Sequence, residues 1–378
     1  MKEFFEKNRI AVNIVCIIAT AAITIYTGMN FYNFRNYKEI IIPGPGVSEV
    51  FMLSKYFPDI EGTYADTEVY VLQGSKPGGS LLVLGGTHPN EPSSHIAAIA
   101  MIESSVIEEG TVYVIPRTNN SAFTHNDSQE AAPQFYHIEG QNGTRKFVFG
   151  SRATNPLDQW PDPDVYIHAS SQQKLSGSET RNINRAYPGV ADGTLTERAA
   201  YAIVNMINAL DINVTIDLHE ASPEYPTINA TVAHENSMNL AAVGILEVQM
   251  NGIAMSLEPS PVSLRGLTHR ELGDFTNTLP LLMETGNASQ GRMRGATNEQ
   301  LVITGIDKFY TKAAELGYIY IPYDDSGVSL NERVGRQLQG IIEYSKAYGE
   351  LYGKNITITG LPTYTQLMGG HDIGEWLN

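Results

Sequence analysis

Short apolar runs alternate with helical patterns along most of the chain. Six runs are typical of strands: residues 81–86, 111–116, 213–218, 228–233, 253–257 and 279–283. Helical patterns occupy residues 92–107, 196–210 and 330–352. Strands that alternate with helices predict an α/β fold with a mixed, largely parallel central sheet flanked by helices. Such sheets carry their chemistry at the carboxyl ends of the strands.

Two of the helical patterns are amphipathic. In residues 196–210, Thr196 is placed to act as the N-cap. The predicted buried stripe of this helix is formed by Ala199, Ala200, Ile203, Val204 and Ile207. Residues 330–352 repeat apolar side chains at helical spacing from Leu330 to Tyr348. The helical C-terminal third argues against a separate terminal β-barrel, so we interpret residues 49–378 as one domain.

The N-terminal region contains an uncharged apolar stretch, residues 10–29. Twenty residues of helix just span a hydrocarbon core of about 30 Å. A cleaved signal peptide is the alternative, but its best cleavage triplet, residues 19–21, lies inside the apolar run. We therefore predict a transmembrane signal anchor at 10–29, after a short cytoplasmic N-terminus, residues 1–9. Residues 30–48, rich in Pro and Gly at their end, form the predicted tether.

Charge and cysteine content narrow the function. The chain has 378 residues, with 25 Lys and Arg against 41 Asp and Glu, a net charge of −16. So acidic a protein repels a phosphate backbone, which makes nucleic acid an unfavourable partner. The single cysteine, Cys16, lies in the apolar stretch. A disulfide framework and a thiolate zinc site are thus excluded, and a metal in the main domain must be held by His and carboxylate side chains.

A first chemical motif follows the predicted strand 81–86. Two glycines lead into His88, and Glu91 follows three residues later. Glycine allows a tight turn at this point, and His and Glu are good zinc ligands. Taken alone, however, this tetrapeptide pattern also fits a plain surface turn.

A second motif ends the predicted strand 213–218, where His219 follows Asp217 by two positions. Two predicted strands that both end in His, with a carboxylate near the first, favour a shared metal site over a plain surface turn. His88, Glu91 and His219 would leave one open position on a tetrahedral zinc ion, which is the layout of a catalytic site. Asp217 is a candidate to orient His219 by accepting a hydrogen bond.

Two further motifs complete the set. Residues 181–189, RNINRAYPG, combine guanidinium and amide groups suited to binding a carboxylate. Glu284 closes the apolar strand 279–283, where a carboxylate is costly unless it has a partner or a role. Beside a zinc-bound water, Glu284 would be a general base with a raised pKa.

Together these motifs resemble the succinylglutamate desuccinylase/aspartoacylase branch of the zinc carboxypeptidase superfamily. Residues 85–91, GGTHPNE, resemble that branch's Gly-Gly-x-His-Gly-Asn-Glu, with Pro89 in place of Gly. Residues 182–189 resemble its Asp-Leu-Asn-Arg-x-Phe-Pro-Gly, with Asn182 in place of Asp. Asp217-Leu218-His219 and Glu284-Thr285-Gly286 follow in the right order. The helical C-terminus is closer to the carboxypeptidases.

The resemblance implies roles for individual residues. It implies one zinc ion held by His88, Glu91 and His219, with Glu284 as the general base. It also implies that Asn184 and Arg185 bind a substrate carboxylate. An arginine that polarises the scissile carbonyl is expected as well, with Arg152 and Arg181 as the candidates.

The sequence thus predicts a membrane-anchored zinc hydrolase that cleaves an amide bond of a small-molecule or peptide substrate with a free carboxylate. The preferred substrate is an N-acyl amino acid. A carboxypeptidase acting on peptides or cell-wall peptides is the alternative, and a tethered binding protein with a lapsed active site is an alternative of another class. The weak charge bias around residues 10–29 favours a catalytic domain outside the cytoplasm.

Overall fold

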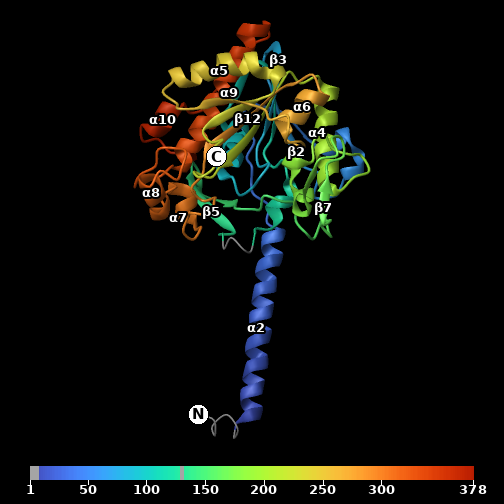
Figure 1. The fold of residues 1–378 in the computed structure, drawn as a ribbon, viewed down its shortest axis with the longest axis vertical. Coiled ribbons are helices and arrows are strands. Elements are labelled where there is room, and N and C mark those ends of the chain that lie inside the picture. Colours follow the sequence, from blue (N-terminus) through green and yellow to red (C-terminus); the bar gives the residue numbers. More distant parts are fainter. Residues whose placement is uncertain (1–7, 128–131) are drawn as a thin grey trace. The chain divides into compact units, whose positions relative to one another are not determined.

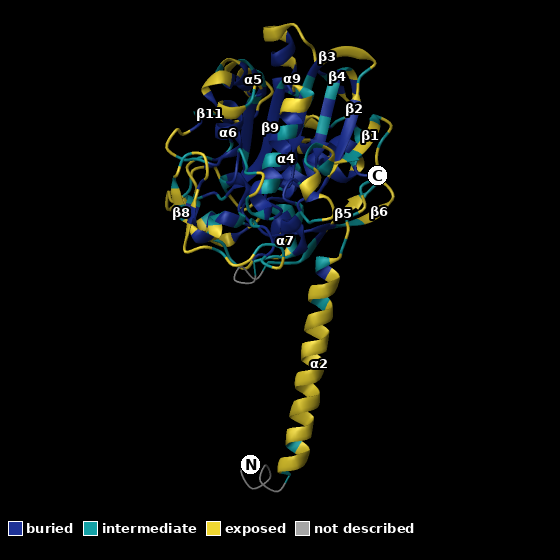
Figure 2. Ribbon diagram, turned by 90° about the vertical axis from the view of Figure 1, so that its right-hand side faces the viewer, coloured by how far each residue is buried: buried dark blue, intermediate teal, exposed yellow. Residues whose placement is uncertain are grey.

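The computed structural model describes residues 8–127 and 132–378, and the chain divides into two units, Met1–Lys38 and Glu39–Asn378. The smaller unit contains one long helix, α2 (Arg9–Arg35), whose side chains are mostly exposed (Figure 2). By length and composition this helix is able to cross a membrane, and an N-terminal signal sequence meets the same test. The predicted boundaries at residues 9, 29 and 48 stay predictions.

The larger unit is built on a mixed sheet (Figure 1). Its strand order is β1-β2-β4-β3-β9-β12-β10-β11, and β13 pairs with β4. The four central strands β4, β3, β9 and β12 are parallel to one another. The strands of this sheet are β1 (Val47–Met52), β2 (Glu68–Gln73), β3 (Lys76–Leu84), β4 (Val106–Ile115), β9 (Val214–Ala221), β10 (Ala230–Ala233), β11 (Ser256–Pro259), β12 (Leu279–Gly286) and β13 (Thr357–Thr359).

Helices cover both faces of this sheet because alternate side chains of each central strand point to opposite faces. Leu81 and Val83 pack with α3 (Pro92–Ser104), α5 (Met238–Met250) and α9 (Leu330–Tyr352). Leu82 and Leu84 face the other way, toward α4 (Leu195–Leu210) and Leu272 of α6 (Thr268–Phe275). The predicted class, an α/β fold with helices on both faces, is therefore confirmed.

Short elements connect and flank these layers. Two hairpins lie in the long segment between β4 and α4: β5 (Phe135–Gly140) with β6 (Gly143–Val148), and β7 (Val165–Ile167) with β8 (Lys174–Ser176). The remaining helices among the described residues are α7 (Glu299–Thr304), α8 (Lys308–Glu315) and α10 (Tyr364–Met368). The 3₁₀ turns are η1 (Leu53–Tyr56), η2 (Pro58–Ile60), η3 (Asn120–Thr124), η5 (Gly177–Arg181), η6 (Ile183–Arg185), η7 (Glu235–Ser237) and η8 (Ile373–Trp376).

One predicted helix start is wrong. Helix α4 begins at Leu195, and its N-cap is Thr194 rather than Thr196. Thr194 accepts a hydrogen bond from the backbone of Glu197, whose side chain bonds back to Thr194 in a capping box. The predicted buried stripe of this helix is confirmed, and helix α9 has the predicted bounds.

Candidate metal centre and substrate cavity

The first two candidate ligands lie in the turn between β3 and α3. Gly86 adopts a positive φ of 61°, a conformation that glycine adopts without strain. A Cβ at this position would lie 2.6 Å from the ring of Phe123, so a larger residue does not fit. The turn brings His88 and Glu91 to the start of α3, where both side chains are buried and Glu91 is the N-cap residue.

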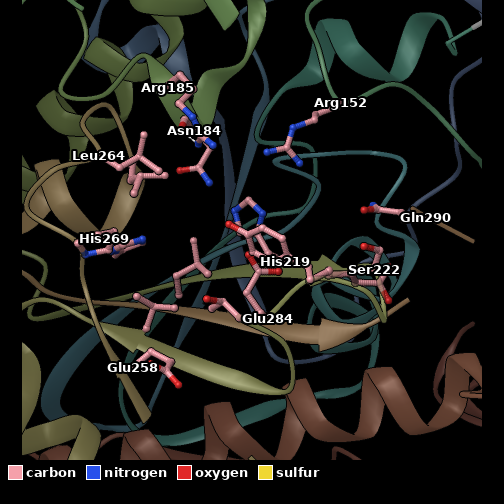
Figure 3. A pocket seen from close by; sticks show the side chains of 18 of the residues that line it. Arg152, Asn184, Arg185, His219, Ser222, Glu258, Leu264, His269, Glu284 and Gln290 are labelled. Atoms are coloured by element: carbon pink, nitrogen blue, oxygen red, sulfur yellow. Dashed lines mark hydrogen bonds between the residues drawn. The ribbon is translucent and has the colours of Figure 1, made fainter. Parts of the chain in front are cut away.

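The other two motifs lie on neighbouring strands. Strands β9 and β12 are parallel, and their register sets His219 beside Glu284. Adjacent strands are about 4.8 Å apart, so the two side chains emerge next to each other on one face of the sheet. Figure 3 shows both among the side chains that line one cavity.

Three side chains that are distant in the sequence come together at this point. Donor atoms of His88, Glu91 and His219 all lie within 4.8 Å of one another. The Nδ1 atom of His88 is 2.8 Å from Glu91 Oε1, and the Nδ1 atom of His219 is 3.0 Å from Glu91 Oε2. All three side chains are almost completely buried.

Hydrogen bonds on the far sides of the two rings fix which nitrogen faces inward. His88 Nε2 lies 2.9 Å from the amide oxygen of Asn182, whose nitrogen donates to Glu179. His219 Nε2 lies 2.9 Å from a carboxylate oxygen of Asp217. Both oxygens are acceptors, so each Nε2 carries the hydrogen and each Nδ1 presents a lone pair.

The inward-facing atoms therefore fit a cation. Two imidazole lone pairs and a carboxylate converge, and their repulsion is relieved by a proton or by a metal ion. Two His and one Glu are a usual donor set for a catalytic zinc ion. Hydrogen bonds that hold the second ring nitrogen are also typical of metal-binding histidines.

The pKa shifts reflect the same crowding. Burial lowers the pKa of His88 to about 4, which keeps its ring neutral at pH 7. Burial opposes charge on both His219 and Glu91, but their mutual attraction is stronger. The pKa of His219 is raised well above its usual value by Asp217 and Glu91, and the pKa of Glu91 is lowered by the two imidazoles.

Glu284 differs from Glu91 in having no hydrogen-bond or ion-pair partner among the residues that the structure describes. Its Oε2 atom is buried and makes no hydrogen bond. Burial raises the pKa of Glu284 to about 8. A carboxyl group held near neutral pH, beside a donor cluster and facing a cavity, is suited to accept and return a proton.

The cavity beside these residues has a volume of about 430 Å³. Asn184, Arg185 and Arg152 line it together with His219 and Glu284 (Figure 3). The oxygen of the Asn184 side chain accepts hydrogen bonds from the backbone and hydroxyl of Thr268, at 2.8 and 3.0 Å. These bonds leave the NH₂ group of Asn184 available to a ligand in the cavity.

The structure separates the two candidate arginines. Arg152 lines the cavity, and its Nη1 atom is 3.5 Å from Glu91 Oε1. Arg181 does not line it. The Arg181 guanidinium makes a two-point ion pair with Asp162, at 2.7 and 3.0 Å, and donates to the carbonyl of Thr154. Because these bonds direct the side chain elsewhere, Arg181 does not fit the role of a carbonyl-polarising arginine.

A second group with metal-binding geometry consists of His234, Glu235 and Asp274. Arg270 donates to Glu235 at 2.7 Å and to Asp274 at 3.2 Å. A guanidinium already balances these carboxylates, so this group is an ion-pair network.

Some cavity residues carry no sequence signal. His269 and Glu258 both line the cavity, yet neither belongs to a motif. His269 is the second residue of the short helix α6, and its Nδ1 atom is 2.8 Å from Ser260 Oγ. Glu258 lies on β11 at the sheet edge. Glu258 reaches the cavity through the pairing of β11 with β10, and His269 reaches it from α6; the sequence encodes neither arrangement locally.

His269 gives a prediction about acid stability. Burial lowers its pKa to about 3, whereas an unfolded His titrates near 6.5. Below pH 6.5 the unfolded chain binds a proton that the folded chain does not, so stability falls as the pH drops. Between pH 7 and 5 the His269→Gln variant should lose about 2 kcal/mol less unfolding free energy than the unmodified chain. Urea unfolding followed by circular dichroism, with a chelator present, measures this difference; equal losses would contradict it.

Comparison with known proteins gives a likeness of fold. No protein-family model and no curated protein sequence matches the chain. Similar solved structures include a succinylglutamate desuccinylase/aspartoacylase from Rhodobacter sphaeroides, at 16% identity and a TM-score of 0.42, which covers 80% of this chain and 62% of that one. A metallo-carboxypeptidase from Burkholderia cenocepacia has 11% identity and a TM-score of 0.46, covering 80% and 66%. The cell shape determinant protein Csd4 from Helicobacter pylori has 10% identity and a TM-score of 0.44, covering 80% and 58%.

The first two structures carry the names of the two groups that the sequence motifs resemble. The chain spans less than two thirds of the length of each of the three proteins. At these identities and TM-scores the likeness says nothing about substrate, so the function is argued from the residues of the cavity.

Proposed function

We propose that this chain is a zinc-dependent hydrolase that cleaves an amide bond of a substrate with a free carboxylate. One observation carries the proposal. Two imidazole lone pairs and the carboxylate of Glu91 converge beside Glu284, whose buried Oε2 atom makes no hydrogen bond, at a cavity that also presents Asn184 and Arg185. The cavity therefore combines a candidate metal site, a general base and side chains that can bind a carboxylate.

Bound zinc would supply an acidified water and polarise the scissile carbonyl. Glu284 takes the proton of the attacking water, because its carboxyl group lies beside His219 on the cavity wall and its Oε2 atom makes no hydrogen bond. The same group then returns that proton to the departing amine. Its raised pKa places both steps near neutral pH.

The charged side chains of the cavity have separate tasks. Arg152 lies next to the donor cluster and stabilises the negative charge that develops on the carbonyl oxygen. Arg185 and the NH₂ group of Asn184 bind the substrate carboxylate. A planar guanidinium is well suited to that task, because it donates two hydrogen bonds to one carboxylate.

N-acyl amino acids are the proposed substrates, with hydrolysis releasing the acyl group and the free amino acid. Helix α2 is proposed to anchor the enzyme in a membrane, with the larger unit outside the cytoplasm. A basic residue, Arg9, precedes the apolar part of this helix and Arg35 closes it.

Purified full-length protein in detergent tests the proposal. We expect about one zinc per chain by elemental analysis, and hydrolysis that a chelator abolishes and added zinc restores. Substrates should be tested in matched pairs, an N-acyl amino acid or dipeptide with a free carboxyl end and the same compound with an amidated end. Only the free acids should turn over. A protein without zinc and without turnover would support the lapsed binding protein instead.

A further inference from the structure

The register of the sheet defines the floor of the cavity beyond the catalytic residues. On β12, Leu282 is two residues before Glu284 and therefore points to the same face. Leu282 pairs with Val232 of β10, and Val232 pairs with Glu258 of β11. All three line the cavity. The cavity floor is thus a row of three side chains, in which the apolar Leu282 and Val232 are followed by the carboxylate of Glu258 on the edge strand.

Glu258 is half-buried and has no ion-pair partner among the residues that the structure describes. Its one hydrogen bond there is a long one, 3.4 Å, from the hydroxyl of Ser256. Of the other two carboxylates that line the cavity, Glu220 is paired with Arg333 at 2.7 Å, and Glu284 is the proposed base. Glu258 is therefore an acid on the cavity wall that is available to a ligand.

The opposite side of the cavity carries the positive charge. Figure 3 shows Arg152 and Arg185 on one side, and Glu258 beyond Glu284 on the other. A ligand whose carboxylate lies at Arg185 would meet Leu282 and Val232 next and Glu258 last. Two strand spacings separate Leu282 from Glu258, which is about 10 Å between Cα atoms. That span suits an aliphatic stem followed by a charged end group.

Part of the remaining cavity lining is apolar. Pro261, Leu264 and Leu267, from the segment that follows β11, line the same cavity. Burying a hydrocarbon chain between such side chains is favourable, whereas burying an ammonium group there is costly unless an anion faces it. Lysine fits such a cavity, because its side chain is a long apolar stem that ends in a compact ammonium group.

We infer that Glu258 is a specificity-determining residue that selects amino acids with a cationic end on an aliphatic side chain. This inference rests on the proposed function, because it assigns the leaving amino acid of that same reaction. The cleaved bond lies at Glu284, the carboxylate of the amino acid is bound by Asn184 and Arg185, and its side-chain ammonium is bound by Glu258.

Matched substrates isolate the charge. Nα-acetyl-lysine and Nα-acetyl-norleucine differ at the end of the side chain, so their ratio of kcat/KM measures the contribution of the ammonium group. Both enantiomers of each should be assayed with the zinc-loaded full-length protein. We expect a ratio of about 10 to 100 in favour of lysine, the range of a charged hydrogen bond. In Glu258→Gln the ratio should fall to near 1, mainly because the lysine substrate loses activity.

A control variant and a binding assay keep the outcomes separate. Glu108→Gln removes an exposed acid on β4, outside the cavity, and should leave the ratio unchanged. Calorimetric binding of free lysine and norleucine tests the subsite without turnover. One outcome is that lysine binds preferentially, Glu258→Gln abolishes this preference, and no substrate is hydrolysed. That outcome would contradict the hydrolase proposal and support the subsite. Hydrolysis with equal ratios in the unmodified chain and Glu258→Gln would overturn the subsite alone.

Discussion

Replacing Glu284 by Gln should lower kcat by about 10²- to 10⁴-fold while the protein keeps its zinc. Glutamine has nearly the same shape and removes the group that accepts the proton of the attacking water. The three converging ligands stay intact, because Glu284 is not one of them. Measured kcat with a good substrate, together with elemental analysis for zinc, tests both halves of this expectation.

Two further observations make the result specific. Glu284 makes no hydrogen bond through its buried Oε2 atom, so the amide replaces no internal contact at that atom and the variant should fold normally. Glu108→Gln, which changes an exposed acid in the same way, should retain full activity. Activity of Glu284→Gln within a few-fold of the unmodified chain would show that another group is the base.

The sequence is informative where local pattern and chemistry coincide. His88 and Glu91 follow two glycines in one short turn, so a local motif contains both. His219 and Glu284 each end an apolar strand, and parallel strands bring such ends to one edge of a sheet. The α/β fold follows from the same alternation of strands and helices.

Other features depend on long-range packing and cannot be predicted from local pattern. Arg152 and Arg181 are equally plausible in sequence, and only the ion pair with Asp162 removes Arg181 from the cavity. Glu258 has no motif, because its position depends on how β11 pairs at the sheet edge. The error at Thr196 has a local origin, since a threonine two residues earlier forms the capping box with Glu197.

Asn182 shows how a departure from a family motif can be structurally sound. Its amide oxygen accepts from His88 Nε2, as a carboxylate would, and its amide nitrogen donates to Glu179. The outer nitrogen of the His88 ring is therefore held by a neutral acceptor rather than by a carboxylate. His219, by contrast, is held by the charged Asp217. The two histidines thus differ in basicity, which agrees with the opposite directions of their pKa shifts.

Replacing Glu91 by Gln should weaken zinc binding by more than 100-fold and abolish hydrolysis at ordinary zinc concentrations. Glu91 is the one carboxylate of the donor cluster, and both of its oxygens face an imidazole nitrogen. An amide keeps one oxygen but loses the charge, and its NH₂ group cannot bind a cation.

The comparison variant for this change is Asp217→Asn, which alters the group behind His219, a carboxylate whose other oxygen accepts a hydrogen bond from Thr87. It should cost about 10- to 100-fold in zinc affinity, the usual effect of an orienting partner. Competition with a chromophoric chelator measures both affinities, and circular dichroism checks that each variant is folded. The order of the two effects is the decisive result, because a ligand must matter more than the residue that positions one. If folded Glu91→Gln binds zinc as tightly as Asp217→Asn does, then Glu91 is not a ligand and the proposed metal centre is wrong.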